Sequence, residues 1–327
     1  MVHKKKSQLS LFFIGHFAID TVIRFEKENN PTLGGSVSYC SLALNKYTNN
    51  VKISIISNIG KKNFESKHLE LLNNSAIDLD GVKWSDAENT HFILKYQNHE
   101  RTLFLKSCSP KLDFNDIPEN YLKTPPHGIV LVPLCNELDI QYVEHIVENF
   151  PETYIGIDLQ GFIREIDENG NVSLAKKEET IIKINKIISI IGNKLILKGS
   201  EEEMKLLSGK QDLNEVMEYF NNVQYKGISI MTLGDKGSMI TQRGKKMLII
   251  PAFKPDKVVD ETGAGDVYLS IFMYEYLTSN KSWEKIAEAG YLASAAASFV
   301  VEKIGTQGVK KKEKVLERLN SKKYIKN

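Results

Sequence analysis

Residues 258–274 read Val-Val-Asp-Glu-Thr-Gly-Ala-Gly-Asp-Val-Tyr-Leu-Ser-Ile-Phe-Met-Tyr, and the rest of the chain is organised around them. The apolar positions 267, 271 and 274 recur with the period of a helix, so a buried helix is expected to follow the Gly-Ala-Gly corner. Gly263 and Gly265 leave the backbone bare where the chain enters this helix. Unpaired N–H groups and the positive end of the helix dipole are exposed at such a point, and together they predict an anion-binding site.

Asp266 falls in the first turn of the expected helix, and two interpretations of its carboxylate are open. An acid at a helix start gains roughly 0.3–1 kcal/mol from the dipole and needs no other function. Alternatively, Asp266 is a general base that faces a substrate hydroxyl while the bare amides hold a transferring phosphoryl group. A P-loop is excluded, because the chain contains no Gly-x-x-x-x-Gly-Lys-Ser/Thr.

Length and composition are those of an ordinary globular protein: 327 residues, 42% hydrophobic, 26% charged, with a formal net charge of +2. This charge favours neither a nucleic-acid nor a membrane partner, and the lysines at 4–6 and 310–312 are expected at solvated ends. No apolar stretch approaches the roughly 18 residues of a membrane span, which predicts a soluble cytoplasmic protein. Cys40, Cys108 and Cys135 show no Cys-x-x-Cys spacing, which favours reduced thiols over a disulfide or zinc framework.

Short apolar runs alternate with amphipathic segments along the chain. Strands are expected at 11–14, 51–56, 128–133, 154–159, 195–198, 227–232 and 238–242, and helices from 36 and over 64–72, 138–150, 178–189, 200–207 and 283–301. Residues 90–96 and 101–105 read as an antiparallel hairpin in a small appended sheet. The alternation predicts an α/β fold with a mostly parallel sheet covered on both faces, whose ligands bind beyond the carboxyl ends of the strands.

Several candidate residues follow expected strands, and each also has a structural interpretation. Asp20 is either a turn acid or a substrate ligand, and the pair Gly34-Gly35 either a tight turn or a close approach of backbone to ligand. Gly234 and Gly237 suit a nucleotide phosphate or a hairpin turn equally well. Ser200 and Glu203 form Ser-x-x-Glu, the pattern of a helix capping box.

These motifs resemble those of the ribokinase-like carbohydrate and nucleoside kinases, also called the PfkB family. The resemblance is strongest at residues 260–266, which are similar to the family signature Asp-Thr-x-Gly-Ala-Gly-Asp, and it extends to 15–20, 34–35 and 231–238. Residues 15–20, 33–39 and 157–164 look most like the archaeal and plant branch that contains myo-inositol kinases.

The resemblance implies a three-layer α/β/α ribokinase-like fold, here a single domain over 1–327 with a small β lid formed by about 17–30 and 88–107. It implies that the γ-phosphoryl group of ATP is transferred, with Mg²⁺, to a hydroxyl of a sugar or polyol such as myo-inositol. The implied roles are Asp266 as general base; Gly263, Ala264 and Gly265 as anion hole; Asp20, Gly34, Gly35, His16 and Asp158 at the acceptor; Thr232, Gly234, Gly237 and Lys198 at ATP; and Glu203 at magnesium, through water.

The sequence departs from the family pattern at two positions, and two other functions remain open. Ser200 stands where the magnesium-associated motif of the family has asparagine, which favours the capping box, and Glu261 stands where threonine is common. A nucleoside kinase is one rival, with Phe17, Phe92 or Tyr96 stacking on a base or else packing the lid. A non-catalytic sugar- or nucleotide-binding regulator is the other. A dinucleotide-dependent oxidoreductase is disfavoured, because Gly-x-Gly-x-x-Gly does not follow the first strand. The exposed strand edges of the lid would allow two copies to pair as a homodimer.

Overall fold

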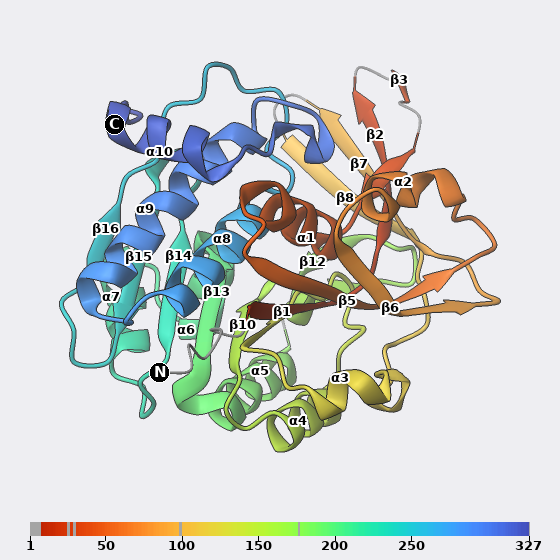
Figure 1. Ribbon diagram of the computed structural model, residues 1–327, viewed down its shortest axis with the longest axis horizontal. Coiled ribbons are helices and arrows are strands. Elements are labelled where there is room, and N and C mark those ends of the chain that lie inside the picture. The colour runs from red at the N-terminus through yellow and green to blue at the C-terminus, as the bar shows by residue number, and fades with distance from the viewer. Residues whose placement is uncertain (1–7, 25–26, 29–30, 98–99, 176, 327) are drawn as a thin grey trace, which may run out of the picture.

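The computed structural model describes residues 8–24, 27–28, 31–97, 100–175 and 177–326, and a nine-stranded sheet forms its centre (Figure 1). The strand order is β16-β15-β14-β13-β10-β9-β1-β5-β6. The strands are β1 (Leu9–Ile14), β5 (Val51–Gly60), β6 (Ile77–Ser85), β9 (Gly128–Leu131), β10 (Tyr154–Asp158), β13 (Leu195–Ser200), β14 (Ile228–Thr232), β15 (Ser238–Gln242) and β16 (Leu248–Ile250). All neighbours pair in parallel except at the β14-β15-β16 end, so the predicted mostly parallel sheet is confirmed.

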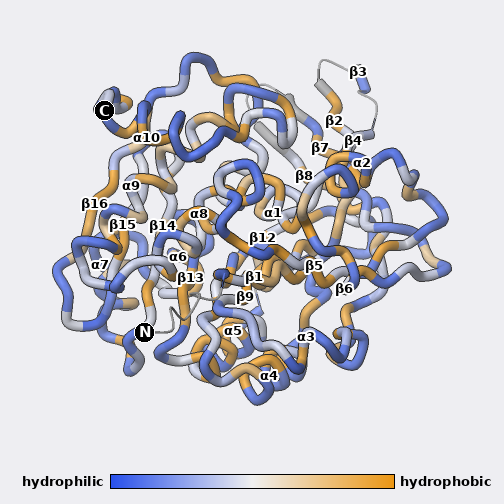
Figure 2. Tube along the Cα trace, in the orientation of Figure 1, coloured by the Kyte–Doolittle hydropathy of each residue, from blue (hydrophilic) through white to orange (hydrophobic). Residues whose placement is uncertain are grey.

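Helices cover both faces of this sheet. They are α1 (Ser36–Tyr47), α2 (Glu70–Asn73), α3 (Glu119–Lys123), α4 (Ile140–Asn149), α5 (Glu178–Ile191), α6 (Glu201–Ser208), α7 (Leu213–Asn221), α8 (Ala264–Thr278), α9 (Trp283–Val300) and α10 (Lys312–Ser321). Alternate residues of β1 point to opposite faces. Leu11 and Phe13 share a core with α1, α8 and α9, whereas Phe12 and Ile14 pack with α4 to α7. In Figure 2 hydrophobic residues gather in the central strands and hydrophilic residues in the outer loops.

A second, smaller sheet lies beside the first and has the order β3-β2-β7-β8, with β4 also on β2. Its strands are β2 (Ala18–Arg24), β3 (Lys27–Glu28), β4 (Thr32–Gly34), β7 (Thr90–Gln97) and β8 (Glu100–Ser107). The predicted hairpin is therefore confirmed, and the segment after β1 joins it through a parallel β2–β7 pairing. A two-stranded ribbon, β11 (Arg164–Ile166) and β12 (Val172–Leu174), reaches β8, where the Leu105 N–H donates to the Gly170 carbonyl at 2.7 Å.

Several elements have no counterpart in the sequence analysis, among them β6, β11, β12, β16, α3, α7 and α10. β6 is the last strand of the sheet, half exposed and rich in acids, so it lacks the apolar run of a buried strand. The expectation of a solvated end at 310–312 is wrong for Lys312. Its ammonium pairs with Glu275 Oε1 at 2.5 Å and lies over the rings of Tyr47 and Tyr274. Within the described ranges, every helix is too short or too polar to cross a membrane.

Candidate active site

The corner before α8 has the geometry that its glycines require. Gly263 has φ 82°, in the left-handed region, and a Cβ there would lie 2.1 Å from the ring of Tyr39. A Cβ on Gly265 would lie 2.5 Å from Lys198 Nζ. Both positions therefore exclude a side chain, and the bare backbone of the corner lies against a buried ammonium group. Positive charge from Lys198 thus adds to that of the helix N-terminus.

Asp266 is buried in the first turn of α8, and its Oδ1 has no hydrogen-bond partner among the described residues. Burial, followed by the nearby charge of Asp158, raises the pKa of Asp266 to about 6. Lys198 and a hydrogen bond with Ser36 oppose this rise. A carboxylate with a pKa near neutrality and an unpaired oxygen has the properties of a general base.

A buried ion pair lies behind the corner. Lys198, at the end of β13, donates to Asp158 Oδ2, at the end of β10, at 2.7 Å. Burial alone would lower the pKa of Lys198, but the carboxylates of Asp158 and Glu203 outweigh burial and keep that pKa above its ordinary value. Neither Lys198 nor Asp158 lines either of the two cavities described below. The ion pair therefore lies in the protein interior behind the Gly263–Gly265 backbone and packs against it.

Glu203 completes a capping box at the start of α6. Its Oε2 accepts the Ser200 N–H at 2.8 Å, while Ser200 Oγ accepts the Glu203 N–H at 3.4 Å. The capping interpretation of these two residues is therefore confirmed. Burial and the charge of Asp158 raise the pKa of Glu203, which places its carboxylate in the same electrostatic cluster as Lys198.

A cavity of about 50 Å³ lies on one side of the α8 N-terminus, and we call it the acceptor cavity after the role that the sequence resemblance implies for Asp20 and Gly35. It is lined by Ala18, Asp20, Gly35, Ser36, Tyr39, Phe92, Leu94, Leu103, Leu134, Gln160, Arg164, Thr262 and Asp266. Gly34 makes room for Asp20, because a Cβ there would lie 1.9 Å from Asp20 Oδ2. His16 does not line this cavity. Its buried ring bonds instead to the Pro110 carbonyl and the Thr90 hydroxyl.

Gln160 and Arg164 line the acceptor cavity and were missed as site residues. Arg164 Nη2 donates to Gln160 Oε1 at 2.6 Å once the amide is oriented to satisfy both groups, and Nη1 donates to the Leu134 carbonyl at 3.0 Å. The guanidinium also lies 5.8 Å from the centre of the Phe92 ring. The available signals were their position after β10, at the carboxyl edge of the sheet, and their place in the 157–164 stretch that resembles the myo-inositol kinases.

The aromatic residues proposed to stack on a base fall in different surroundings. Phe17 is fully buried and packs against Phe64, with ring centroids 6.5 Å apart, so it is a core residue. Phe92 lines the acceptor cavity beneath Arg164. The side chain of Tyr96 lies outside the described part of the chain.

A larger cavity of about 410 Å³, the donor cavity, lies on the other side of the corner. It is lined by Ser200, Thr232, Gly234, Asp235, Gly237, Ala252, Phe253, Pro255, Val258, Glu261, Ala264, Gly265, Tyr268, Ser294, Ala297, Ser298, Val301 and Ile325. Three residues predicted at ATP, Thr232, Gly234 and Gly237, are among them. The C-terminal segment was not anticipated: the Ile325 N–H donates to the Ala252 carbonyl at 2.9 Å and so brings Ile325 to the cavity.

The two cavities are lined by different residues of the same helical turn, the first turn of α8. Ala264 and Gly265 line the donor cavity, whereas the next residue, Asp266, lines the acceptor cavity. The corner thus separates a large site, lined in part by apolar side chains, from a small site that contains a buried carboxylate.

Comparison with known proteins agrees with this geometry. The profile of the pfkB family carbohydrate kinases matches residues 32–313. The chain is 25% identical over 324 residues to a nucleoside kinase of Methanocaldococcus jannaschii, covering 94% of this chain and 95% of the relative. It is 32% identical over 247 residues to a ribokinase of Lactococcus lactis, covering 72% and 77%. A solved pyrophosphate-dependent kinase of the ribokinase family, bound to a pyrophosphate analogue and myo-inositol, superposes with a TM-score of 0.72 at 19% identity, covering 94% and 99%. The chain therefore belongs to the pfkB family of carbohydrate kinases, phosphotransferases that act on an alcohol group of a sugar or nucleoside.

Proposed function

We propose that this protein transfers the γ-phosphoryl group of ATP to a hydroxyl of a small sugar or polyol. The observation that carries the proposal is the division of one helical turn between two cavities, with Asp266 on one side and Ala264 and Gly265 on the other. A donor and an acceptor bound in these cavities would meet at the α8 N-terminus. Phosphoryl transfer depends mainly on such positioning and on charge stabilisation.

Within this proposal, each group at the corner has one task. Asp266 Oδ1 accepts the proton of the acceptor hydroxyl, since it is buried and has no partner among the described side chains. The amides of Gly263 to Gly265 and the dipole of α8 stabilise the negative charge of the transferring group. Lys198, beneath Gly265, adds a fixed positive charge. Exclusion of water would protect the phosphoryl group from hydrolysis.

The chemistry of the nearby oxygens fits Mg²⁺, which the kinase family implies. Mg²⁺ prefers oxygen ligands, keeps several waters and binds through one or two carboxylates together with substrate phosphates. Glu203 and Asp158 supply buried carboxylates near the corner, although each already has a partner, in Ser200 and Lys198 respectively. We therefore assign Glu203 a role in holding the hydrated ion through water, while Asp158 stays paired with Lys198. The ion would neutralise charge on the donor phosphates.

ATP is proposed over pyrophosphate because of the apolar end of the donor cavity. Ala252, Phe253, Ala297 and Ile325 line this end, and an adenine ring would bury its faces against them. Pyrophosphate has no group that needs such a surface. The variant Ala297→Phe tests this choice: we expect it to raise the KM for ATP and to leave any use of pyrophosphate unchanged. Equal use of both donors by the wild type would refute the assignment.

A polyol or sugar is proposed as the acceptor because the cavity is small and polar at several points. Asp20, Gln160 and Arg164 offer acceptors and donors for adjacent hydroxyl groups. Myo-inositol is the first compound to test. A nucleoside is the second candidate, favoured by the similarity to the Methanocaldococcus kinase over nearly the whole chain. A base would have to displace Arg164 from Phe92 in order to stack on that ring.

The decisive experiment measures donor consumption and phosphorylated product with Mg-ATP over myo-inositol, ribose, fructose, adenosine and cytidine. Asp266→Asn serves as the matched control for contaminating kinases. Turnover on a polyol or sugar that disappears in the variant supports the proposal. Turnover confined to nucleosides supports the second candidate, and ATP binding without any turnover supports the non-catalytic regulator.

We also propose that the small sheet acts as a lid and that two copies pair through it. The lid covers the acceptor cavity with Phe92, Leu94 and Leu103. One edge of the sheet, at β8, is partly covered by Gly170 and Asn171, so pairing would use the side of the short strands β3 and β4. Light scattering after size exclusion would reveal a dimer, and a monomer at all concentrations would refute the pairing.

A further inference from the structure

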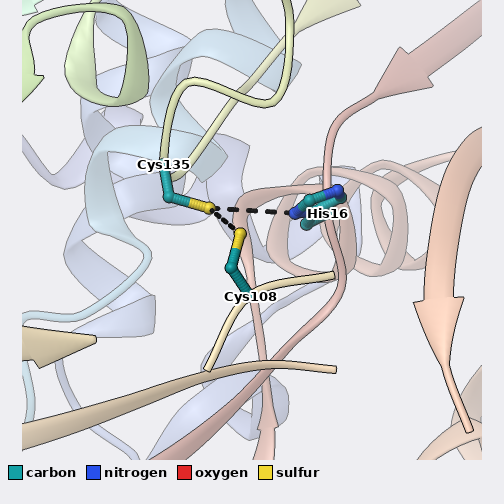
Figure 3. A group of neighbouring side chains, drawn as sticks. All are labelled: His16, Cys108 and Cys135. Atoms are coloured by element: carbon teal, nitrogen blue, oxygen red, sulfur yellow. Dashed lines mark hydrogen bonds between the residues drawn. The ribbon is translucent and has the colours of Figure 1, made fainter. Parts of the chain in front are cut away.

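Three soft ligand groups converge outside both cavities. His16 follows β1, Cys108 follows β8 and Cys135 follows β9, so three separate segments contribute (Figure 3). The two Sγ atoms lie 3.0 Å apart, Cys135 Sγ lies 3.8 Å from His16 Nδ1, and all three ligand atoms fall within 4.8 Å of one another. The sequence spacing had favoured separate reduced thiols. The fold leaves these thiols unbridged but places them in contact.

The histidine ring is held in the orientation that a metal ligand needs. His16 Nε2 lies 2.9 Å from the Pro110 carbonyl. A carbonyl can only accept, so Nε2 carries the proton, and the neutral ring keeps its lone pair on Nδ1. Without an ion, Nδ1 accepts a hydrogen bond from the Thr90 hydroxyl at 2.9 Å, and a bound metal would take the place of that donor. Figure 3 shows Nδ1 on the side of the ring that faces the sulfur atoms. A hydrogen bond from the second ring nitrogen to a carbonyl is the usual support of a metal-bound histidine.

Two of the three loops that carry the ligands, those of His16 and Cys135, are fixed by a buried carboxylate. Glu137 accepts the backbone N–H groups of His16, Leu134 and Cys135 at 2.8–3.0 Å. Its Oε1 also lies 3.9 Å from His16 Nδ1, which adds negative charge beside the cluster. Because Cys108 is exposed while His16 and Cys135 are buried, the cluster is open on one side for entry of an ion.

We propose that His16, Cys108 and Cys135 form a binding site for a thiophilic divalent cation, Zn²⁺, separate from the magnesium of the kinase reaction. Thiolates and imidazole are the ligands that Zn²⁺ prefers, with Zn–S near 2.3 Å and Zn–N near 2.0 Å. Tetrahedral bonds of this length put two sulfurs roughly 3.8 Å apart, so the thiols would separate by less than about 1 Å. Solvent would occupy the fourth position.

Such an ion would join the two sheets beside the acceptor cavity. Cys108 lies at the end of the small sheet, whereas His16 and Cys135 follow strands of the large one. Leu134, next to Cys135, and Ala18, near His16, both line the acceptor cavity. The ion would therefore fix the small sheet against the main body of the protein.

Cobalt titration of the reduced full-length chain tests the site without reference to catalysis. We expect one Co²⁺ per chain with a thiolate-to-cobalt charge-transfer band, and displacement of that band by Zn²⁺ but not by Mg²⁺. Cys108→Ser and Cys135→Ser should each abolish the band. Cys40→Ala, which removes the third thiol, should retain it. The exposure of Cys108 makes its serine variant the one least prone to misfolding.

A second measurement keeps the proposal testable if one variant folds poorly. Zn²⁺ should raise the Tm of the wild type and leave that of Cys108→Ser unchanged, and a chelator should reverse the rise. No charge-transfer band in the wild type, or a band that survives Cys108→Ser, would overturn the assignment. Recovery of a Cys108–Cys135 disulfide from protein prepared without added oxidant would also overturn it in favour of a redox pair.

Discussion

Replacement of Asp266 by asparagine should inactivate the protein and stabilise it. The side chains have the same shape, but asparagine carries no charge and cannot accept a proton. We expect kcat to fall by roughly 10²–10⁴, the usual contribution of a positioned base. Affinity for the donor should change little, because the amides and Lys198 remain. Steady-state kinetics and calorimetric titration of the donor measure the two quantities.

The gain in stability follows from the pKa of Asp266. Its rise from an ordinary 3.8 to about 6 corresponds to a cost on the order of 3 kcal/mol for keeping the group ionised in the folded state, at about 1.4 kcal/mol per pKa unit. Because the folded pKa is the higher one, this cost is absent below about pH 4 and complete above about pH 6. Urea unfolding should therefore show a stability advantage for Asp266→Asn that grows between these limits and then stays constant. An active variant would refute the role of Asp266 as base, and a variant less stable than wild type at pH 8 would refute the buried-charge argument.

Three further substitutions test the surroundings of the site. Lys198→Met removes a charge that lowers the pKa of Asp266, so the acid limb of the pH profile of kcat should move to higher pH. A pH profile that stays in place would contradict the electrostatic coupling between Lys198 and Asp266. Asp20→Asn should raise the acceptor KM at least roughly tenfold, since a hydrogen bond to a charged group contributes about 1.5–3 kcal/mol. In two-substrate kinetics the same variant should leave the donor KM unchanged. Glu137→Gln puts an amide where a carboxylate accepts three N–H groups, and urea unfolding should show a loss of roughly 1–3 kcal/mol; unchanged stability would mean that the loop tolerates an unpaired donor.

The α8 corner could be predicted because its signal is local. Glycines at 263 and 265, an acid at 266 and a helical period afterwards lie within one short stretch, and each has a direct physical consequence. The alternation of strands and helices also predicted which edge of the sheet carries the site, since the carboxyl ends of parallel strands all lie on the same side. Asp20, which follows β1 and lies in β2, was placed by the same argument.

The remaining site residues depend on contacts that no local pattern encodes. Arg164 reaches the acceptor cavity after a short 3₁₀ turn, and Ile325 reaches the donor cavity through a backbone bond to Ala252, 73 positions earlier in the chain. Cys108 and Cys135 meet because two different sheets end at the same point. His16 was assigned to the acceptor by family position alone, whereas its ring bonds to the Pro110 carbonyl and the Thr90 hydroxyl and lies beside the two thiols.

The balance of charge around the corner explains why the donor should need a divalent cation. Three carboxylates, Asp158, Glu203 and Asp266, share this region with two cations, Lys198 and Arg164. Burial and, after it, the negative charge of Asp158 raise the pKa of Asp266 and Glu203. An anionic donor in the adjacent cavity would add repulsion and hold Asp266 in its protonated, inactive form. Mg²⁺ on the donor phosphates removes that repulsion, so donor affinity measured by calorimetry should fall when the ion is withheld. Equal affinity with and without Mg²⁺ would show that the corner amides and Lys198 suffice to hold the donor.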